Sequence, residues 1–150
     1  MAFRSFMDVA LAEAQAAADR EEVPVGAVIV QDGQIIARDG NRTRERKDPT
    51  AHAEMLVIRA ACAALGKERL SGCDLYVTLE PCPMCAAAIS HARVARLYFG
   101  AADPKSGGVA QGARVFQHPQ CHHKPEIYDG IGAGASEALL KAFFASKRAE

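Results

Sequence analysis

Apolar and polar positions along this chain repeat with two different periods, and each period indicates a type of secondary structure. Residues 5–20 place apolar side chains every three or four positions, which predicts a helix. Two short runs rich in β-branched residues, 25–30 and 35–37, follow this helix. They are joined by the pair Asp32-Gly33, which is typical of hairpin turns. We therefore expect an opening helix followed by two antiparallel strands.

The rest of the chain alternates helical and strand-like segments, interrupted by a long irregular stretch at 100–124. The expected elements after the hairpin are a helix at 51–65, a strand at 74–80, a helix at 83–92, strands at 94–99 and 126–128, and a helix at 136–148. We expect the apolar residues of the last helix to lie in the core. This order predicts a three-layer α/β/α architecture around a five-stranded mixed sheet, and its length suits a single domain, 1–150.

The overall charge and composition narrow the classes of function without selecting one. The 18 basic and 18 acidic residues cancel, so no global field attracts nucleic acid, and any RNA binding must depend on local patches. The chain has no apolar run long enough for a membrane span and no signal-peptide core at its start, so we expect a cytoplasmic protein. Five cysteines, an odd number, argue against a disulfide framework.

The loop at 40–50 is one such local patch, because it carries four basic residues directly before His52. They are Arg42, Arg44, Arg46 and Lys47. A solvated loop is the ordinary explanation for a run of charges, yet functional residues concentrate on loops. The sequence supports both interpretations of this loop equally.

The segment 80–85, Glu-Pro-Cys-Pro-Met-Cys, carries the most distinctive chemistry of the chain. Proline favours the first position of a helix, so Pro83 predicts a helix start with Cys82 near its N-cap and Cys85 in its first turn. Residues three apart share a helix face. Both sulfur atoms can therefore point at one metal ion.

A second helix start lies upstream, where Thr50 is a suitable N-cap and His52 and Glu54 follow. Zinc favours imidazole and thiolate ligands in a tetrahedron, and catalytic sites use three protein ligands and leave the fourth position for water. His52, Cys82 and Cys85 supply three such ligands. Glu54 is two residues from His52 and leaves a helix in a different direction, so we expect it beside the metal rather than bound to it.

A C-x-x-C pair alone is compatible with a redox pair, half of a structural zinc site or two core thiols. The proline before Cys82 and the His-x-Glu segment upstream complete the pattern H-x-E…P-C-x-x-C, which is typical of zinc-dependent nucleobase deaminases. The combined pattern is far more specific than either part. It favours a catalytic zinc site over the other interpretations.

With these motifs in place, the chain resembles the bacterial tRNA adenosine deaminases of the cytidine-deaminase-like superfamily over nearly its whole length. The segments that carry the resemblance are 22–28 (EVPVGAV), 40–42 (GNR), 48–54 (DPTAHAE), 75–82 (LYVTLEPC), 84–85 (MC), 99–101 (FGA) with Asp103 and Lys105, and 122–126 (HHKPE). The zinc pattern is common to the superfamily, whereas the flanking segments are similar to its tRNA branch. The resemblance implies a cytidine-deaminase-like fold, one Zn²⁺ per subunit, and conversion of adenosine to inosine at the tRNA wobble position.

The resemblance also implies roles for particular residues. The implied metal ligands are His52, Cys82 and Cys85, the implied proton shuttle is Glu54, and the implied substrate-binding residues are Asn41, Ala53, Asp103 and Lys105. Asn41 matches a position that contacts the flipped base, and Asp103 matches one near the ribose. A homodimer and a tRNA anticodon stem-loop are the implied partners, with the stem-loop touching the region of Phe143, Phe144, Lys147 and Arg148.

Two other functions fit the same zinc motif. A free-base or nucleotide deaminase acting on guanine, cytosine or dCMP would share the zinc core, and zero net charge suits a small substrate. A non-catalytic zinc module would need a fourth protein ligand, for which Cys121 is the candidate. The cluster Cys121-His122-His123 is otherwise either a second metal site or a loop cluster without metal.

Overall fold

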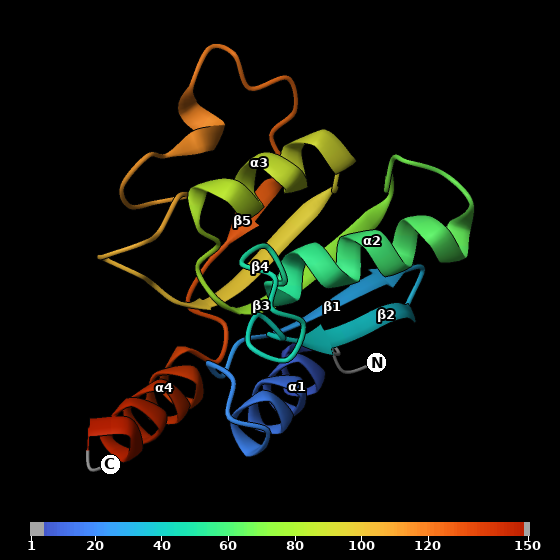
Figure 1. Cartoon of the computed structure of the whole chain (residues 1–150). Helices are drawn as coiled ribbons and strands as arrows, with labels where there is room; N and C mark the ends of the chain where they lie inside the picture. The colour runs from blue at the N-terminus through green and yellow to red at the C-terminus, as the bar shows by residue number, and fades with distance from the viewer. Residues whose placement is uncertain (1–4, 149–150) are drawn as a thin grey trace.

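The computed structural model describes residues 5–148 as one sheet of five strands with helices on both faces (Figure 1). The helices are α1 (Met7–Asp19), α2 (Ala53–Leu65), α3 (Pro83–Ala92) and α4 (Ala133–Arg148), with a short 3₁₀ turn, η1 (Val115–Gln117). The strands are β1 (Gly26–Gln31), β2 (Gln34–Gly40), β3 (Cys73–Leu79), β4 (Arg96–Ala101) and β5 (Glu126–Tyr128). Every helix and strand expected from the sequence is present.

The sheet is mixed, as predicted, with the strand order β2-β1-β3-β4-β5. β1 runs antiparallel to both β2 and β3, whereas the β3–β4 and β4–β5 pairs are parallel. β2 extends beyond the predicted strand at 35–37, because Arg38 and Asp39 pair with Val28 and Ala27 of β1. Their polar side chains break the apolar pattern without breaking the strand, since strand pairing uses the backbone.

Side chains of the sheet alternate between two layers of helices, since successive strand residues face opposite sides. α2 and α3 cover one face, and α1 and α4 lie on the other (Figure 1). The larger core, on the side of α2 and α3, includes Ile29, Leu75, Val77, Leu97 and Phe99 from the strands. The smaller core, on the side of α1, includes Phe6, Met7, Ala10, Val28, Val30 and Tyr76. The predicted α/β/α layering is confirmed.

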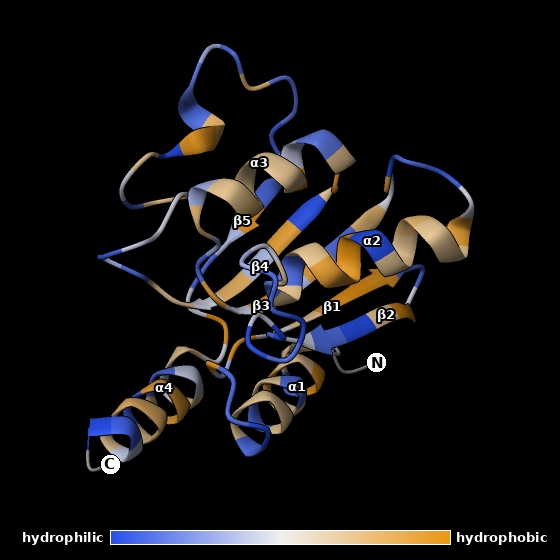
Figure 2. Ribbon diagram, in the orientation of Figure 1, coloured by the Kyte–Doolittle hydropathy of each residue, from blue (hydrophilic) through white to orange (hydrophobic). Residues whose placement is uncertain are grey.

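The last helix, α4, is less covered than the sequence predicts. Only Ser136 is fully buried in it, and the Ser136 hydroxyl donates a hydrogen bond of 2.6 Å to the carbonyl oxygen of Thr78. The expectation that its apolar residues lie in the core is wrong, because α4 projects beyond the sheet with apolar residues along its length (Figure 2). Phe144 is 44% exposed. No helix within residues 5–148, α4 included, combines the length and the apolar character needed to cross a membrane.

Close packing of α1 on β1 depends on Gly26. A Cβ added at this position would lie 2.0 Å from the carbonyl oxygen of Ala10 and 2.5 Å from the backbone nitrogen of Ala14. Because both atoms belong to the helix backbone, Gly26→Ala should lower the free energy of unfolding by about 1–3 kcal/mol in urea denaturation. Gly134→Ala is the matched control, since nothing lies within 4 Å of the added Cβ in α4. Equal losses of stability for the two variants would contradict this account of the packing.

Candidate metal centre

Two helix starts meet beyond the carboxyl end of β3 and bring three metal-ligating side chains together. His52 is the N-cap residue of α2, Cys82 is the N-cap residue of α3, and Cys85 lies in the first turn of α3, after Pro83. The Nδ1 atom of His52 lies 3.7 Å from the Sγ of Cys82 and 3.5 Å from the Sγ of Cys85. Within residues 5–148, this is the one group of three His, Cys, Asp or Glu side chains placed to hold a metal ion.

The geometry of this group fits zinc. A tetrahedral Zn²⁺ bound to imidazole at about 2.0–2.1 Å and to thiolate at about 2.3 Å places nitrogen and sulfur roughly 3.6 Å apart. The two distances from His52 to the cysteine sulfurs bracket this value, and all three ligand atoms lie within 4.8 Å of one another. Across the described residues no fourth protein side chain joins the group, so its ligand count is that of a catalytic zinc site.

The pKa values of the two thiols shift in opposite directions. The hydrogen bond from Cys85, with a further contribution from His52, lowers the pKa of Cys82 to about 4. The same hydrogen bond and burial raise the pKa of Cys85 above its ordinary value. The hydrogen bond to Cys82 also raises the pKa of His52. A second thiolate is therefore favourable only beside a cation, which is the electrostatic condition that a bound Zn²⁺ meets.

Glu54 lies in the first turn of α2 and is only 4% exposed. Burial raises the pKa of its carboxyl group to about 7, and the carboxyl group interacts with His52, Cys82 and Cys85. A bound cation moves such a pKa back down, because it favours the charged form. The site therefore places a buried carboxyl group, able to take up and release a proton, beside the metal-binding group.

Asn41 connects the end of β2 to the helix that carries His52. The Asn41 Oδ1 accepts a hydrogen bond of 2.8 Å from the backbone N–H of Ala53, and both residues are buried. This bond satisfies one of the free N–H groups at the start of α2. The expectation that Thr50 caps this helix is wrong, because the Thr50 hydroxyl donates to Asp48 instead. Asn41 thus lies directly against the metal-binding helix.

A groove of about 540 Å³ opens between the loop after β4 and the exposed side of α4. Asp103 and Lys105 line it from the loop, and Phe144 and Arg148 line it from α4. Leu79, the last residue of β3, lies at its wall and leads directly into the segment that carries Cys82. The groove therefore brings together residues that the sequence links to substrate binding from two distant parts of the chain.

Phe143 and Lys147, also expected near RNA, lie outside the lining of this groove. Phe143 packs edge-on against Phe144, with ring centroids 5.4 Å apart. The Nζ atom of Lys147 lies 5.4 Å from the Phe143 ring centroid and forms an ion pair with Glu21. These contacts tie the end of α4 to the segment after α1.

Comparison with known proteins agrees with this geometry. Residues 2–101 match the family model of the cytidine and deoxycytidylate deaminase zinc-binding region, and the match includes His52, Glu54, Cys82 and Cys85. The chain belongs to this deaminase family. The zinc-binding character of the family and the His-Cys-Cys group identify Zn²⁺ as the metal that this site binds.

The chain is similar in sequence to tRNA-specific adenosine deaminases and, less strongly, to a guanine deaminase. It is 62% identical over 143 residues to the tRNA-specific adenosine deaminase of Agrobacterium fabrum, covering 95% of this chain and 94% of that protein. A solved structure from studies of A-to-I editing by tRNA:A34 deaminases at the wobble position of transfer RNA is 62% identical, with a TM-score of 0.89 and coverage of 90% and 98%. The guanine deaminase of Bacillus subtilis is 32% identical, with a TM-score of 0.67 and coverage of 99% and 95%.

Two buried carboxylates of this deaminase are structural features that the sequence analysis did not single out. Glu22 and Glu80 are 1% and 2% exposed. The Glu22 carboxylate accepts hydrogen bonds from the backbone N–H groups of Arg44 and Glu45, which fixes the basic loop. Arg42 in that loop forms ion pairs with neighbouring acidic side chains, so part of its charge is neutralised locally. No local signal in the sequence marks these two carboxylates as buried, because the loops that they bind lie 22 or more positions further along the chain.

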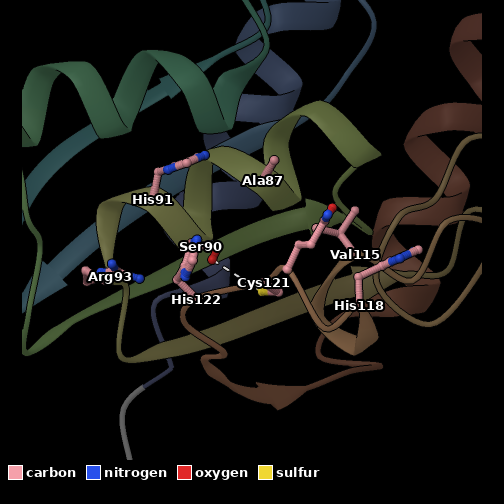
Figure 3. A pocket seen from close by; sticks show the side chains of 9 residues that line it. Ala87, Ser90, His91, Arg93, Val115, His118, Cys121 and His122 are labelled. Atoms are coloured by element: carbon pink, nitrogen blue, oxygen red, sulfur yellow. Dashed lines mark hydrogen bonds between the residues drawn. The ribbon is translucent and has the colours of Figure 1, made fainter.

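A smaller pocket of about 200 Å³ lies at the other end of α3 (Figure 3). Cys121 lines it together with His91, His118 and His122. The Cys121 Sγ lies 3.3 Å from the Ser90 Oγ, and the Nε2 atom of His123 hydrogen-bonds the Val94 carbonyl oxygen at 2.7 Å. Within the described chain, Cys121 joins neither the zinc group nor a second metal group, so the hypothesis of a closed four-ligand site is wrong.

Proposed function

We propose that this chain is a zinc-dependent hydrolase that converts adenosine to inosine at the wobble position of tRNA and releases ammonia. The observation that carries the proposal is the three-ligand group of His52, Cys82 and Cys85 with the buried carboxyl group of Glu54 beside it. The 62% identity to a tRNA-specific adenosine deaminase supports tRNA as the substrate.

Each residue of the site has a distinct part in the proposed reaction. His52, Cys82 and Cys85 would hold Zn²⁺, which when bound would supply the activation of a water molecule for attack on the base. Glu54 takes a proton from the attacking water and delivers it to N1 of adenine. The carboxylate then takes the remaining proton of the hydroxyl group now attached to C6 and gives it to the departing amine, so that adenosine and water give inosine and ammonia. Burial suits Glu54 to both steps, because it raises the pKa of the carboxyl group and so opposes the lowering that a bound cation causes.

Asn41 and Ala53 hold the base next to these groups. The Asn41 Oδ1 is engaged by the Ala53 N–H, which fixes the orientation of the side-chain amide. The amide nitrogen of Asn41 supplies two hydrogen-bond donors for acceptor atoms of a flipped adenine. Ala53 contributes to substrate binding by fixing Asn41 in this orientation.

The groove between the loop after β4 and α4 is the proposed binding surface for the anticodon loop. Phe144, which is 44% exposed, offers a ring on which an unstacked base can lie. Lys105 and Arg148 offer positive charge to phosphates, and Asp103 offers an acceptor to a ribose 2′-OH. A local groove of this kind allows RNA binding by a chain whose net charge is zero.

We further propose that residues 1–150 form a single deaminase domain and that two copies associate as a cytoplasmic homodimer. Alignment with a relative over 95% of this chain and 94% of that protein supports the single domain. The resemblance to the tRNA branch supports the dimer, and sedimentation velocity of the zinc-loaded protein tests it.

Substrate choice tests the proposed function. The second candidate is a free-base deaminase, which the 32% identity to a guanine deaminase favours. Ammonia release from a tRNA with a wobble adenosine should exceed that from guanine, adenine or cytosine by about 100-fold or more, because contacts remote from the base lower the barrier. The control is the same tRNA with guanosine at the wobble position, which should release none. Faster release from free guanine than from the wobble-adenosine tRNA would instead establish the second candidate.

A further inference from the structure

The carboxylate of Glu80 is enclosed by backbone N–H groups. It directly precedes the Pro-Cys segment of the zinc site and is 2% exposed. Its Oε1 accepts a hydrogen bond of 3.0 Å from the N–H of Asp103. Its Oε2 accepts hydrogen bonds from the N–H groups of Val109 at 3.1 Å, Ala110 at 2.9 Å and Gln111 at 2.9 Å. One buried side chain therefore binds both ends of the loop 103–111.

The loop is shaped to fit closely around this carboxylate. A Cβ added to Gly107 would lie 2.7 Å from the Cδ and Oε2 atoms of Glu80, so only glycine fits there. The N–H of Gly108 donates a hydrogen bond of 2.8 Å to the carbonyl oxygen of Pro81. The loop is thus attached to the segment that leads into the metal-binding helix, both through Glu80 and through its backbone.

The same loop carries two of the side chains that line the proposed RNA groove, Asp103 and Lys105. The Asp103 Oδ1 accepts hydrogen bonds from the backbone N–H groups of Lys105 and Ser106. These bonds fix the turn 103–106, whose first residue is itself bound to Glu80. The ion pairs found within residues 5–148 do not include Glu80. The described partners of the Glu80 carboxylate are therefore backbone N–H groups of the loop.

We propose that Glu80 is a positioning residue for the substrate, acting through the loop 103–111 to fix Asp103 and Lys105 at a set distance from the metal-binding helix. Both of its carboxylate oxygens are occupied by backbone N–H groups, and its side chain is outside the metal-binding group. It therefore acts neither as a metal ligand nor as a proton shuttle. The expected effect on substrate binding rests on the proposed tRNA deamination. The expected effect on the structure of the loop 103–111 does not.

Glu80→Gln tests the proposal, because it keeps the size of the side chain and replaces one acceptor oxygen with an NH₂ group that faces N–H donors. The zinc content should stay unchanged. The KM for tRNA should rise about tenfold or more, with a smaller change in kcat, since a buried N–H left without an acceptor displaces the loop. Hydrogen exchange at the four bonded amides, followed by NMR, should become faster than in the wild type.

Three further variants separate positioning from loss of stability. Gly107→Ala keeps the Glu80 carboxylate but places a Cβ 2.6 Å from the Asp103 carbonyl oxygen and 2.7 Å from the Glu80 Oε2, so it displaces the loop and should raise KM in the same way. Glu80→Asp keeps the charge and should restore part of the lost affinity. Leu70→Val is the stability control, because Leu70 is fully buried at the opposite end of α3, where its N–H bonds the Ala92 carbonyl oxygen. It should leave KM unchanged.

Loss of zinc in Glu80→Gln would overturn the proposal, as would a fall in kcat with unchanged KM or unchanged exchange at the four amides. An equal rise of KM in Leu70→Val would also overturn it, since that would mean general destabilisation. Should the wild-type protein fail to deaminate tRNA, the proposed function falls, and the exchange measurement still decides whether Glu80 holds the loop.

Discussion

Replacement of Glu54 by Gln is expected to reduce inosine formation by about 10²–10⁴-fold, the usual contribution of a general acid and base. The carboxyl group is buried in the first turn of α2, with its pKa raised by burial to about 7, next to the three metal-ligating side chains. Glutamine fills the same volume but neither takes up nor releases the proton that moves from water to the base. The measurement is the rate of inosine formation under single-turnover conditions, together with the zinc content.

Zinc content should stay at about one ion per chain in Glu54→Gln, because the ligand set stays complete. Glu68→Gln is the matched control, since Glu68 is exposed after α2 and away from the site, and its rate should equal that of the wild type. A near-normal rate for Glu54→Gln would remove Glu54 from the mechanism. A loss of zinc would instead reassign the carboxylate to the metal.

Replacement of His52 by Ala should weaken zinc binding by at least about 100-fold and abolish turnover. His52 is the only nitrogen ligand in the described metal group, and both cysteine sulfurs lie within 3.7 Å of its Nδ1 atom. Loss of partners outside the ligand set already weakens metal binding by about 10–100-fold, so loss of a direct ligand should cost at least about 100-fold. Zinc affinity is measured by competition with a chelator, and zinc content by elemental analysis after dialysis.

His91→Ala is the matched control for this loss. His91 is exposed at the other end of α3 and lies outside the metal-binding group, so its removal should leave zinc affinity unchanged. Retention of one tightly bound zinc ion in His52→Ala would mean that His52 is not a required ligand of the metal.

The fold and the grouping of His52, Cys82 and Cys85 were predictable because their signals are local. Periodicity defines the helices and strands, and Pro83 sets the helix start that places Cys82 and Cys85 on one face. The helix of His52 was also predicted, although its first turn is satisfied by Asn41 rather than by Thr50. The reason is that Asp48 competes for the Thr50 hydroxyl, a choice that a capping pattern does not reveal.

Features that depend on distant contacts were not predictable in the same way. The amphipathic pattern of α4 indicates an apolar face but not whether a partner covers it, and Phe144 lies open on that helix. Glu22 and Glu80 look like ordinary acidic residues in the sequence. Their function as buried acceptors depends on loops 22 or more positions further along the chain, which no short-range period encodes.

The most direct test of the central claim is mass spectrometry of an anticodon stem-loop with a single adenosine at the wobble position, incubated with the zinc-loaded protein. Exchange of the amino group for oxygen changes the mass of that one nucleotide. The account predicts complete conversion to inosine at this nucleotide and no change in a stem-loop that lacks it. An unaltered wobble adenosine, while the same preparation deaminates free guanine, would contradict it.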